Sequence, residues 1–338
     1  MKTINSCLTR APQIPHDPAL LPMHTPIQMR TLKYLLLSGL SLLAVNAWAV
    51  PCPPPSASDP SSDTCLDGSI NVGRANLFTA LSSGAMNLKD NTVTGPSLIQ
   101  GNVGIGGIGS GNFSMSDGKL FGDIYIRYGG KVTFSGPSQH YNAAGDPYNI
   151  KNGEGVYYGN SSHTSDVDMK LQGALDDANN LSSAASMELS SMQGSLPGQY
   201  SVTGGYNFNG STVNTNKSFS ITDNGASQKI VLNLKDLVMT GGTFTLNGTA
   251  TTTYIVNVRS NFSLTGSAKI VLSGGLQASH VLFNVVNSGS QVSLTQGSSL
   301  TGILLAAQRK VDLSGGKVFG KVIGAQINVT SGGQIVSQ

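Results

Sequence analysis

Charged and aromatic residues are scarce in this sequence of 338 residues: Asp, Glu, Lys and Arg make up 11% of it, and Phe, Trp and Tyr 6%. So little charge excludes a coiled coil, a helical bundle and an acidic disordered tail. Only one long apolar run is present, which excludes a polytopic membrane protein, and the glycines lack the three-residue period of collagen. Gly, Ser, Thr and Asn are abundant instead, with 42, 43, 25 and 26 residues, or about 40% of the chain. The composition therefore predicts one large, turn-rich β domain with ample length for a core.

The N-terminal part of the sequence has the features of a targeting segment. Met29 is followed by two basic residues, an apolar stretch over 34–45 and the small-x-small sequence Ala47-Trp48-Ala49. This stretch of about a dozen residues is shorter than the ~20 residues that a transmembrane helix requires. We predict a leader of residues 1–49 that contains a secretory signal peptide, starts at Met29 and is cleaved after Ala49. The alternative is a signal anchor; after cleavage we expect no stable membrane insertion.

The charge balance of the exported part gives no basic surface. Residues 50–338 carry 16 Lys and Arg and 16 Asp and Glu, so the excess of +3 in the whole chain lies in the leader. We therefore expect no nucleic-acid partner. Residues 50–67, which are rich in Pro and Ser, are predicted to form a linker. Within it, Cys52 and Cys65 are predicted to form a disulfide outside the cytoplasm, the alternative being two free thiols in a mobile tail.

From residue 68 to residue 338, short apolar runs alternate with glycine turns, and some of these runs repeat. The sequence KLFGDI at 119–124 returns as KVFGKV at 317–322. A shorter unit, apolar-x-Gly-x-apolar, occurs four times, centred on Gly101, Gly122, Gly302 and Gly320. The glycines within the two pairs are 21 and 18 residues apart, which indicates a period of about twenty residues.

A period of this length, with two or three short strands in each repeat, predicts a parallel β-solenoid, that is, a β-helix. One coil cannot bury its inward residues alone, but coils stacked about 4.8 Å apart shield one another. In the repeated unit, both apolar residues and the glycine have the same parity and are expected to face inward, where a glycine lets the wall bend. The alternative is an antiparallel β-sandwich, which also has frequent turns.

One segment departs from the β pattern and predicts an amphipathic helix over about 165–192. Its apolar positions recur at steps of three and four: Val167, Leu171, Ala174, Leu175, Ala178, Leu181, Ala185, Leu189 and Met192. We expect this helix to pack along the side of the solenoid, over outward apolar residues at Ile303, Leu305, Phe319 and Ile323. Its carboxylate pairs, Asp166 with Asp168 and Asp176 with Asp177, are interpreted as part of a solvated polar face.

The inventory of catalytic and metal-binding residues is small, and we predict no catalytic site, no metal and no cofactor. His140, His163 and His280 are widely separated and lack metal-ligand spacing. The sequence has no phosphate-binding loop and no nucleophile elbow. Asp123, Arg127 and Lys131 are the nearest approach to the acidic and basic cluster of a polysaccharide-acting β-helix enzyme.

A few residues are weak candidates for binding. Thr251, Thr252 and Thr253 form a run of the kind that builds flat ice-binding faces, although threonine is also an ordinary strand residue. Tyr125 and Arg127 lie in the strand-like segment LFGDIYIR. Tyr125, together with Phe121, is either a sugar-stacking platform or covered by the helix or a loop, and we favour the cover.

Several segments carry a resemblance to known families. They are IQGNVGIGG, LFGDIYI, DLVMTGGTFTLNG, SGGLQASHVLFNV and LTGILLAAQRKVDLSGGKVFGKVIG, together with the predicted helix. Their order resembles the choice-of-anchor A family of bacterial surface proteins, which share an adhesive β-solenoid domain. It is also similar to the ice-binding-like β-solenoid family, in which one long helix flanks a three-faced β-helix. The likeness extends from Gly68 to Val336 and is most specific between His280 and Gly324.

These observations together predict a secreted, non-enzymatic surface adhesion domain. A stacked face rich in hydroxyl and amide groups is able to hold extracellular polysaccharide or matrix protein by many weak hydrogen bonds. Ice binding is the first alternative, and a polysaccharide-acting enzyme is the second. A flat, regular face of small hydroxyl residues would favour ice, whereas an irregular face with aromatic residues would favour glycan or protein.

Overall fold

The computed structural model describes residues 64–66, 68–90, 96–107, 111–160, 166–188, 200–204, 212–225 and 229–338. The chain divides into two units, Met1–Ala49 and Val50–Gln338, and every described residue belongs to the second. The predicted leader, its Met29 start, the cleavage site after Ala49 and most of the predicted linker therefore lie outside the described residues. Among the described residues, no helix has the length and apolarity needed to cross a membrane.

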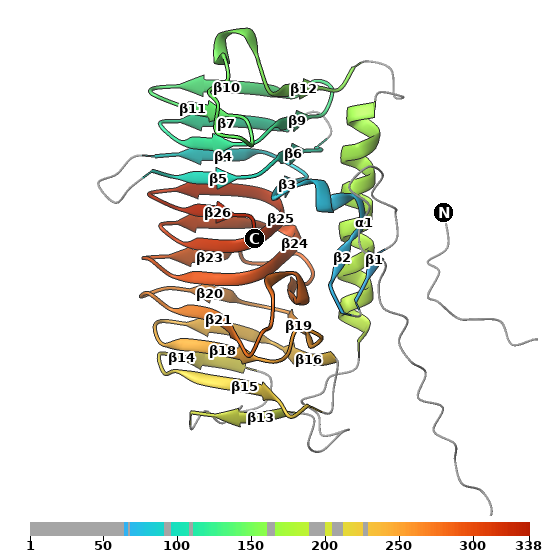
Figure 1. Ribbon diagram of the computed structural model, residues 1–338, viewed down its shortest axis with the longest axis vertical. Helices are drawn as coiled ribbons and strands as arrows, with labels where there is room; N and C mark the ends of the chain where they lie inside the picture. Colours follow the sequence, from blue (N-terminus) through green and yellow to red (C-terminus); the bar gives the residue numbers. More distant parts are fainter. Residues whose placement is uncertain are drawn as a thin grey trace, which may run out of the picture. The chain divides into compact units, whose positions relative to one another are not determined.

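The described residues form a parallel β-solenoid with three faces (Figure 1), which confirms the predicted fold class. Strands of successive coils pair in parallel, whereas the antiparallel strand pairs described are β1 with β2 and β13 with β15. A β-sandwich is thereby excluded. We number the faces in the order in which the chain visits them within a coil.

Face 1 contains, in spatial order, β14 (Thr212–Thr215), β17 (Asp236–Met239), β20 (Phe262–Leu264), β23 (Val292–Thr295), the ends of β24 (Ser299–Ser314) and β25 (Lys317–Thr330), β4 (Met86–Lys89), β7 (Asn112–Ser116) and β10 (Lys131–Ser135). Face 2 contains β13 (Tyr200–Thr203), β15 (Phe219–Asp223), β18 (Thr243–Asn247), β21 (Lys269–Ser273), the starts of β24 and β25, β26 (Gln334–Val336), β5 (Leu98–Gln100), β8 (Lys119–Phe121) and β11 (Gln139–Tyr141). Face 3 contains β16 (Lys229–Leu234), β19 (Thr253–Val258), β22 (Val281–Val285), the middles of β24 and β25, β3 (Ala80–Ser82), β6 (Val103–Ile105), β9 (Ile124–Ile126) and β12 (Val156–Tyr158).

The coils do not stack in sequence order, a feature that the repeat alone does not predict. The last strands of the chain pair with the first: β25 with β3 and β4, and β26 with β5. The N-terminal coils thus lie on top of the C-terminal ones, and the chain ends in the middle of the stack (Figure 1). This pairing satisfies two coil edges whose N–H and C=O groups would otherwise remain open.

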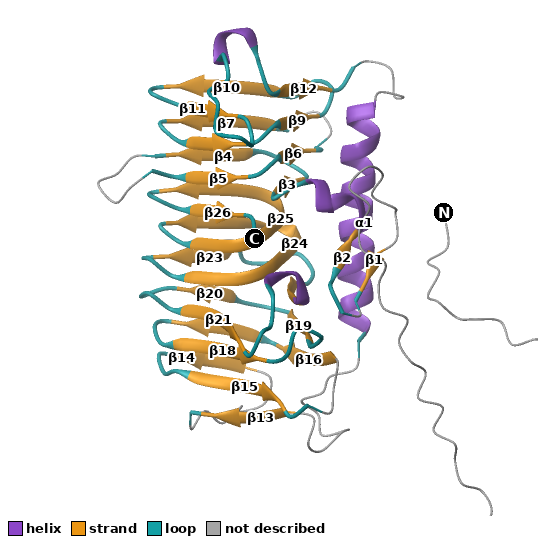
Figure 2. Cartoon of the chain, in the orientation of Figure 1, coloured by secondary structure: helices purple, strands orange, loops and turns teal. Residues whose placement is uncertain are grey.

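The helix α1 (Asp166–Met187) connects the two halves of the stack (Figure 2). Its 22 residues span about 33 Å at 1.5 Å per residue, which matches roughly seven coil steps. It follows β12 at one end of the stack and precedes β13 at the other, so it returns the chain along the side of the solenoid. The predicted helix is confirmed; residues 189–192 of the predicted range lie outside the described residues.

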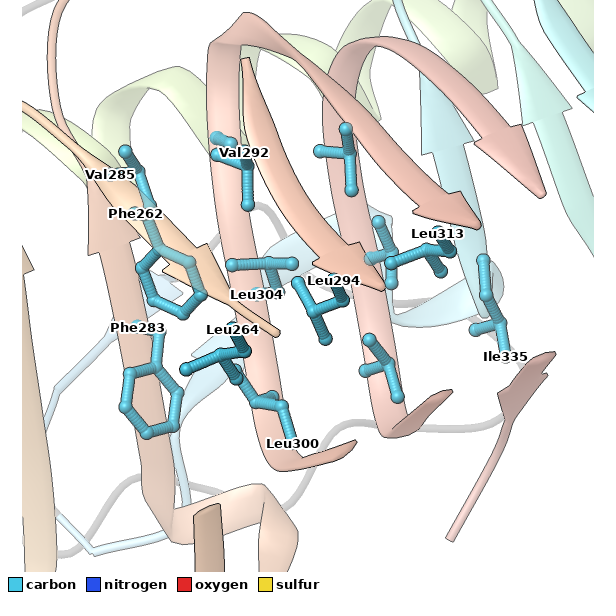
Figure 3. Packing of buried hydrophobic residues seen from close by; sticks show 14 of the residues in the cluster. Phe262, Leu264, Phe283, Val285, Val292, Leu294, Leu300, Leu304, Leu313 and Ile335 are labelled. Carbon is cyan, nitrogen blue, oxygen red and sulfur yellow. The ribbon is translucent and has the colours of Figure 1, made fainter. Parts of the chain in front are cut away.

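Alternate residues of the strands fill the interior, as the predicted parity requires. Phe262, Phe283, Leu294 and Leu304 are buried between the three faces (Figure 3). This core continues through both halves of the stack, because Met86 and Leu88 of β4 belong to the same cluster. One continuous core therefore stabilises the whole solenoid, and outward residues are free to serve binding.

The four repeated glycines share one corner, between face 2 and face 3. Gly101, Gly122, Gly302 and Gly320 all have positive φ angles, from +119° to +145°. Gly302 and Gly320 are direct partners in the register of β24 and β25. The glycine thus permits the bend, as the sequence predicts, and the residue before it belongs to face 2.

Smaller elements close the gaps beside face 3. β1 (Thr64–Cys65) and β2 (Asn71–Val72) form a two-stranded sheet, followed by the 3-10 helix η1 (Gly73–Leu77). Two further 3-10 turns among the described residues are η2 (Ile150–Asn152) and η4 (Ala278–His280). The sheet and η1 contact α1, so this N-terminal segment belongs to the helical cover of the solenoid.

Candidate functional site

Face 3 is largely covered by α1, although Tyr157 and Tyr158 of β12, at one end of the stack, are exposed. A second apolar cluster joins the helix to outward residues of this face, including Ile303, Leu305 and Ile323. This confirms the predicted packing at those three positions. The prediction was wrong for Phe319, which precedes the bend at Gly320 and therefore lies on face 2, outside the cluster.

A ladder of asparagines holds the end of α1 on face 3. Asn284 donates through Nδ2 to Oδ1 of Asn257 (2.8 Å), and Asn257 donates to Oδ1 of Asn233 (2.8 Å). Asn257 Nδ2 also donates to the Ala185 carbonyl (2.7 Å), and Asn284 Nδ2 to that of Ser182 (3.0 Å). The ladder therefore supplies side-chain donors to backbone carbonyls in the last two turns of the helix and ties these turns to face 3.

Two carboxylates of α1 are buried, so the prediction of a fully solvated acidic face was wrong. Asp177 is 2% exposed and forms a bidentate pair with Arg74, with 2.9 Å from Nε to Oδ2 and 2.8 Å from Nη2 to Oδ1. The hydrogen bond to Asp177 raises the pKa of Arg74. Asp168 accepts from the backbone N–H of Tyr128 (3.0 Å). These partners come from segments distant in sequence, and the carboxylates fix α1 rather than bind a ligand.

Lys321 lies under the same cover with an ammonium group that has little contact with water. Its Nζ donates to the carbonyls of Asn76 (2.9 Å) and Phe78 (3.2 Å), at the end of η1. Burial lowers the pKa of Lys321 to about 8. An unfolded lysine titrates near 10.4, so the unfolded chain binds more protons than the folded one between these values.

The free energy of unfolding is therefore expected to rise with pH through the window from about 8 to 10.5, and the pH dependence caused by Lys321 is absent below this window. The unfolding free energy of wild type minus that of Lys321→Met, measured in urea, should increase by about 1–2 kcal/mol between pH 7.5 and pH 9.5. The control variant Lys235→Met changes an exposed lysine and should give a constant difference. A constant difference for Lys321→Met as well would contradict the buried ammonium.

Face 1 is a wide surface of small polar side chains. One outward row, followed through the strand register, reads Asn214, Val238, Ser263, Ser293, Asp312, Asn328, Asn87, Ser114 and Thr133. The neighbouring row reads Thr295, Ser314, Thr330, Lys89, Ser116 and Ser135. Asn87 donates to Oδ1 of Asn328 (2.9 Å), so these side chains link adjacent coils. The residues of face 1 are outside the cluster beneath α1.

Face 2 has a different chemistry, because aromatic residues recur in its central row and lysines recur in the row beside it. The central row reads Thr301, Phe319, Val336, Gln100, Phe121 and Tyr141, each paired in register with the next. The row beside it reads Lys269, Ser299, Lys317, Gln334, Leu98, Lys119 and Gln139. The rings of Phe121 and Tyr141 stack at 4.7 Å with an interplanar angle of 11°. Phe121 is therefore not covered by the helix.

The structure disperses the residues that the sequence offered as binding candidates. Thr251 is exposed, but Thr252 and Thr253 are buried and donate to Oδ2 of Asp223 (2.7 Å) and to the Gly68 carbonyl (2.7 Å). The run therefore forms no outward threonine ladder. Tyr125 packs partly buried against the cluster beneath α1, stacked on Tyr157 at 5.0 Å.

Arg127 lies at a polar groove between α1 and the solenoid. It donates to Oε1 of Gln172 (2.7 Å) and to the Gly106 carbonyl (3.3 Å). The groove has a volume of about 500 Å³ and is lined by residues of α1 and of the corner between faces 3 and 1. A second cavity of about 500 Å³ opens on face 2, beside Val271, Thr301 and Gln338.

The remaining chemical candidates do not converge on one place. Asp123 accepts from the hydroxyl of Tyr148 (2.6 Å) at the corner of faces 2 and 3, Arg127 lies at the groove, and Lys131 is on face 1. His140 is buried, which lowers its pKa. His280 is buried in η4, and His163 lies outside the described residues.

No group of three or more His, Cys, Asp and Glu side chains suited to a metal occurs in the described part of the chain. Cys65 is disulfide-bonded. Its predicted partner, Cys52, lies outside the described residues.

The two rows of face 2 are not predicted as a site from the sequence, although a signal is present there. KLFGDI and KVFGKV repeat the outward Lys and Phe as well as the inward residues and the glycine. The core does not need outward residues to repeat, so their repetition points to the surface.

Comparison with known proteins relates the chain to one family. The sequence model of the ice-binding-like adhesive domain matches residues 71–336. The chain is similar in structure to an ice-binding protein from the Antarctic ascomycete Antarctomyces psychrotrophicus (14% identity, TM-score 0.42, 78% of this chain and 96% of that chain). It is also similar to an ice-binding protein from an Antarctic biological consortium (15%, 0.45, 81% and 94%) and to the DUF3494 domain of ice-binding protein 1 of Shewanella frigidimarina (13%, 0.44, 81% and 99%). No curated protein matches the chain.

Proposed function

Because this chain belongs to the ice-binding-like adhesive domain family, we propose that it is a secreted, non-enzymatic domain that adheres through face 1 to extracellular polysaccharide or matrix protein. The observation that carries the proposal is the wide, regular surface of face 1, with its rows of Ser, Thr and Asn side chains. Many weak hydrogen bonds, presented together on a rigid sheet, add up to useful avidity.

Secretion is supported by the predicted signal peptide and by the disulfide at Cys65, since disulfides persist in oxidising compartments. A non-enzymatic role is supported by the separation of Asp123, Arg127 and Lys131 on different surfaces. A polysaccharide-acting β-helix enzyme needs such residues in one place, so nothing favours that hypothesis.

Adhesion through face 1 is tested with one variant, Ser293→Tyr/Ser114→Tyr, which places two bulky side chains in the outward row from Asn214 to Thr133. Tyrosine is a good strand former, so the fold should persist while the surface loses its flatness. We expect binding to microcrystalline cellulose or to immobilised collagen to fall at least tenfold relative to wild type in a pull-down assay. Ser186→Tyr, on the exposed side of α1, is the matched control and should bind like wild type. Undiminished binding of the face 1 variant would refute the proposed surface.

Ice is the second candidate partner, favoured by the description of the family and by the in-register hydroxyl and amide rows of face 1. Asp312, Lys89 and Val238 interrupt these rows, so we rank ice below a hydroxyl-rich polymer. Thermal hysteresis of the purified chain above that of an albumin solution at equal mass concentration would reverse this ranking. Hysteresis equal to that of albumin would eliminate ice as the partner.

A further inference from the structure

The sequence Lys-x-Phe-Gly occurs twice, at Lys119–Gly122 and Lys317–Gly320, and both copies present the same outward pair on face 2. The glycine and the apolar x residue have structural reasons, because one permits the bend and the other is buried in the core. The outward lysine and phenylalanine have no such role. Their repetition is the observation that the fold and the proposed face 1 site leave unexplained.

The two copies belong to one continuous surface. Between Phe319 and Phe121 the register runs through Val336 of β26 and Gln100 of β5, and Tyr141 of β11 follows Phe121. The two phenylalanines are three coil steps apart, or about 14 Å at the usual strand spacing. The row crosses the junction of the C-terminal and N-terminal coils, so only the folded stack assembles it (Figure 1).

The row beside the aromatic residues is basic, and its charge is not compensated within the described part of the chain. Among the described residues, Lys119, Lys269 and Lys317 make no ion pair within 4.0 Å. None of the described outward positions in the two rows of face 2 is Asp or Glu. The carboxylates at the edges of the face, Asp117 and Asp123, accept from the hydroxyls of Ser116 (2.9 Å) and Tyr148 (2.6 Å) and not from these lysines.

We propose that face 2 is a second binding surface, specific for an acidic polysaccharide of the polyuronate class that lies along the solenoid axis. Lysine ammonium groups pair with the carboxylates of the polymer, and the rings of Phe319, Phe121 and Tyr141 pack against the apolar sides of its sugar rings. The lysines without ion-pair partners favour an acidic polymer over a neutral glycan. This inference uses the extracellular role proposed above but a different face.

The ligand class is tested with alginate, a polyuronate, immobilised on a biosensor and exposed to the full chain. We expect Lys119→Gln/Lys317→Gln to weaken binding at least tenfold at low salt, and 300 mM NaCl to weaken binding of wild type, since exposed charges are screened. The control variant Lys151→Gln/Lys235→Gln removes the same charge from exposed lysines outside the rows of faces 1 and 2 and should stay within twofold of wild type. A second variant, Phe121→Thr/Phe319→Thr, keeps the charge and should weaken binding as well.

Each outcome separates this inference from the proposed adhesion through face 1. Absence of alginate binding by wild type, or equal losses in the two lysine variants, overturns the face 2 site, while retained binding to cellulose or collagen leaves face 1 intact. Binding to immobilised poly-glutamate but not to alginate also overturns it, because the partner would then be an acidic protein segment. Equal melting temperatures of all variants in circular dichroism confirm that the changes do not report unfolding.

Discussion

Replacing Arg309 with methionine is expected to lower the free energy of unfolding by about 3–5 kcal/mol, a large effect for one side chain. Arg309 is 2% exposed, and its guanidinium has no carboxylate partner among the described residues. Burial lowers the pKa of Arg309, because desolvation disfavours the charged guanidinium. The compensation comes from backbone carbonyls.

Those carbonyls belong to two coils other than that of Arg309 itself. Nε donates to Asn287 (2.8 Å), and Nη2 donates to Val286 (2.7 Å) and Arg259 (2.8 Å). Nη1 donates to Ser290 (3.3 Å) and Ser260. The corner between faces 3 and 1 turns irregularly here, so these carbonyls have left the regular ladder, and the planar fork of the guanidinium serves all of them at once.

The variants Arg309→Met and Arg309→Lys separate packing from hydrogen bonding. Methionine fills the space but leaves the carbonyls without donors, each at a cost of about 1–3 kcal/mol where water does not replace the donor. Lysine keeps the charge on a single nitrogen and should lose about 2–3 kcal/mol. Equilibrium urea unfolding measures both. The control variant Arg259→Met, which removes an exposed side chain of the same corner, should stay within about 0.5 kcal/mol of wild type. Equal stability of Arg309→Met and Arg259→Met would refute the carbonyl clamp.

The fold follows from the sequence wherever a pattern is local. The twenty-residue period, the parity of the apolar residues and the helix stripe each depend on neighbours within one coil or one turn. Gly302 and Gly320 illustrate this, because the repeated unit predicts both their inward position and the bend. The order of the coils in space cannot be predicted from these local patterns, because every coil edge offers the same backbone N–H and C=O groups. Nothing in β26 marks β5 as its partner.

The side chains beneath α1 show a second limit of sequence reasoning. A helical pattern assigns Asp177 to the polar side, yet it is buried by Arg74, which is 103 residues away. Asn257 and Asn284 resemble ordinary turn or surface residues in sequence, whereas they donate to carbonyls in the last turns of the helix that lies on their own face. Polar residues have partners that only the tertiary structure defines. The same holds for Thr252 and Thr253, whose hydroxyls are used inside the corner.

The binding faces are predictable only in part, for a related reason. The sequence indicates an outward surface of Ser, Thr and Asn, because these residues alternate with the apolar core. It also contains the Lys-x-Phe-Gly repeat. Whether the two phenylalanines meet on one face depends on the junction of β26 with β5, which joins the two halves of the stack.

Replacing Gly320 with alanine is expected to destabilise the protein by about 3–5 kcal/mol, the second large effect. Its φ of +142° is a conformation that residues with a side chain rarely adopt. In addition, a Cβ at this position would collide with the Gly302 carbonyl oxygen of the adjacent coil and lie 2.8 Å from its carbon. Backbone atoms on both sides of the contact belong to the ladder, so neither is free to move away.

A control at an open position shows what alanine costs at a positive φ without a collision. Gly129 also has a positive φ, +83°, but a Cβ there meets no described atom within 4 Å. Gly129→Ala should therefore show only the conformational cost of about 1–2 kcal/mol. Urea unfolding of the two variants gives the difference, which combines the collision at the bend with the greater cost of alanine at φ +142° than at +83°. Gly302→Ala, whose Cβ would lie 3.0 Å from the Val281 carbonyl oxygen, provides an intermediate case if Gly320→Ala does not fold.

The bend at Gly320 also decides which side chains reach which surface. Phe319, immediately before it, points outward on face 2, and Lys321, immediately after it, lies under the helical cover of face 3. A corner forced open by a methyl group should therefore weaken alginate binding and change the titration of Lys321 together. Equal unfolding free energies for Gly320→Ala and Gly129→Ala would mean that the stack tolerates a side chain at this corner. The repeated glycine would then reflect backbone conformation alone, and the close approach of the coils would not be what fixes the two faces in place.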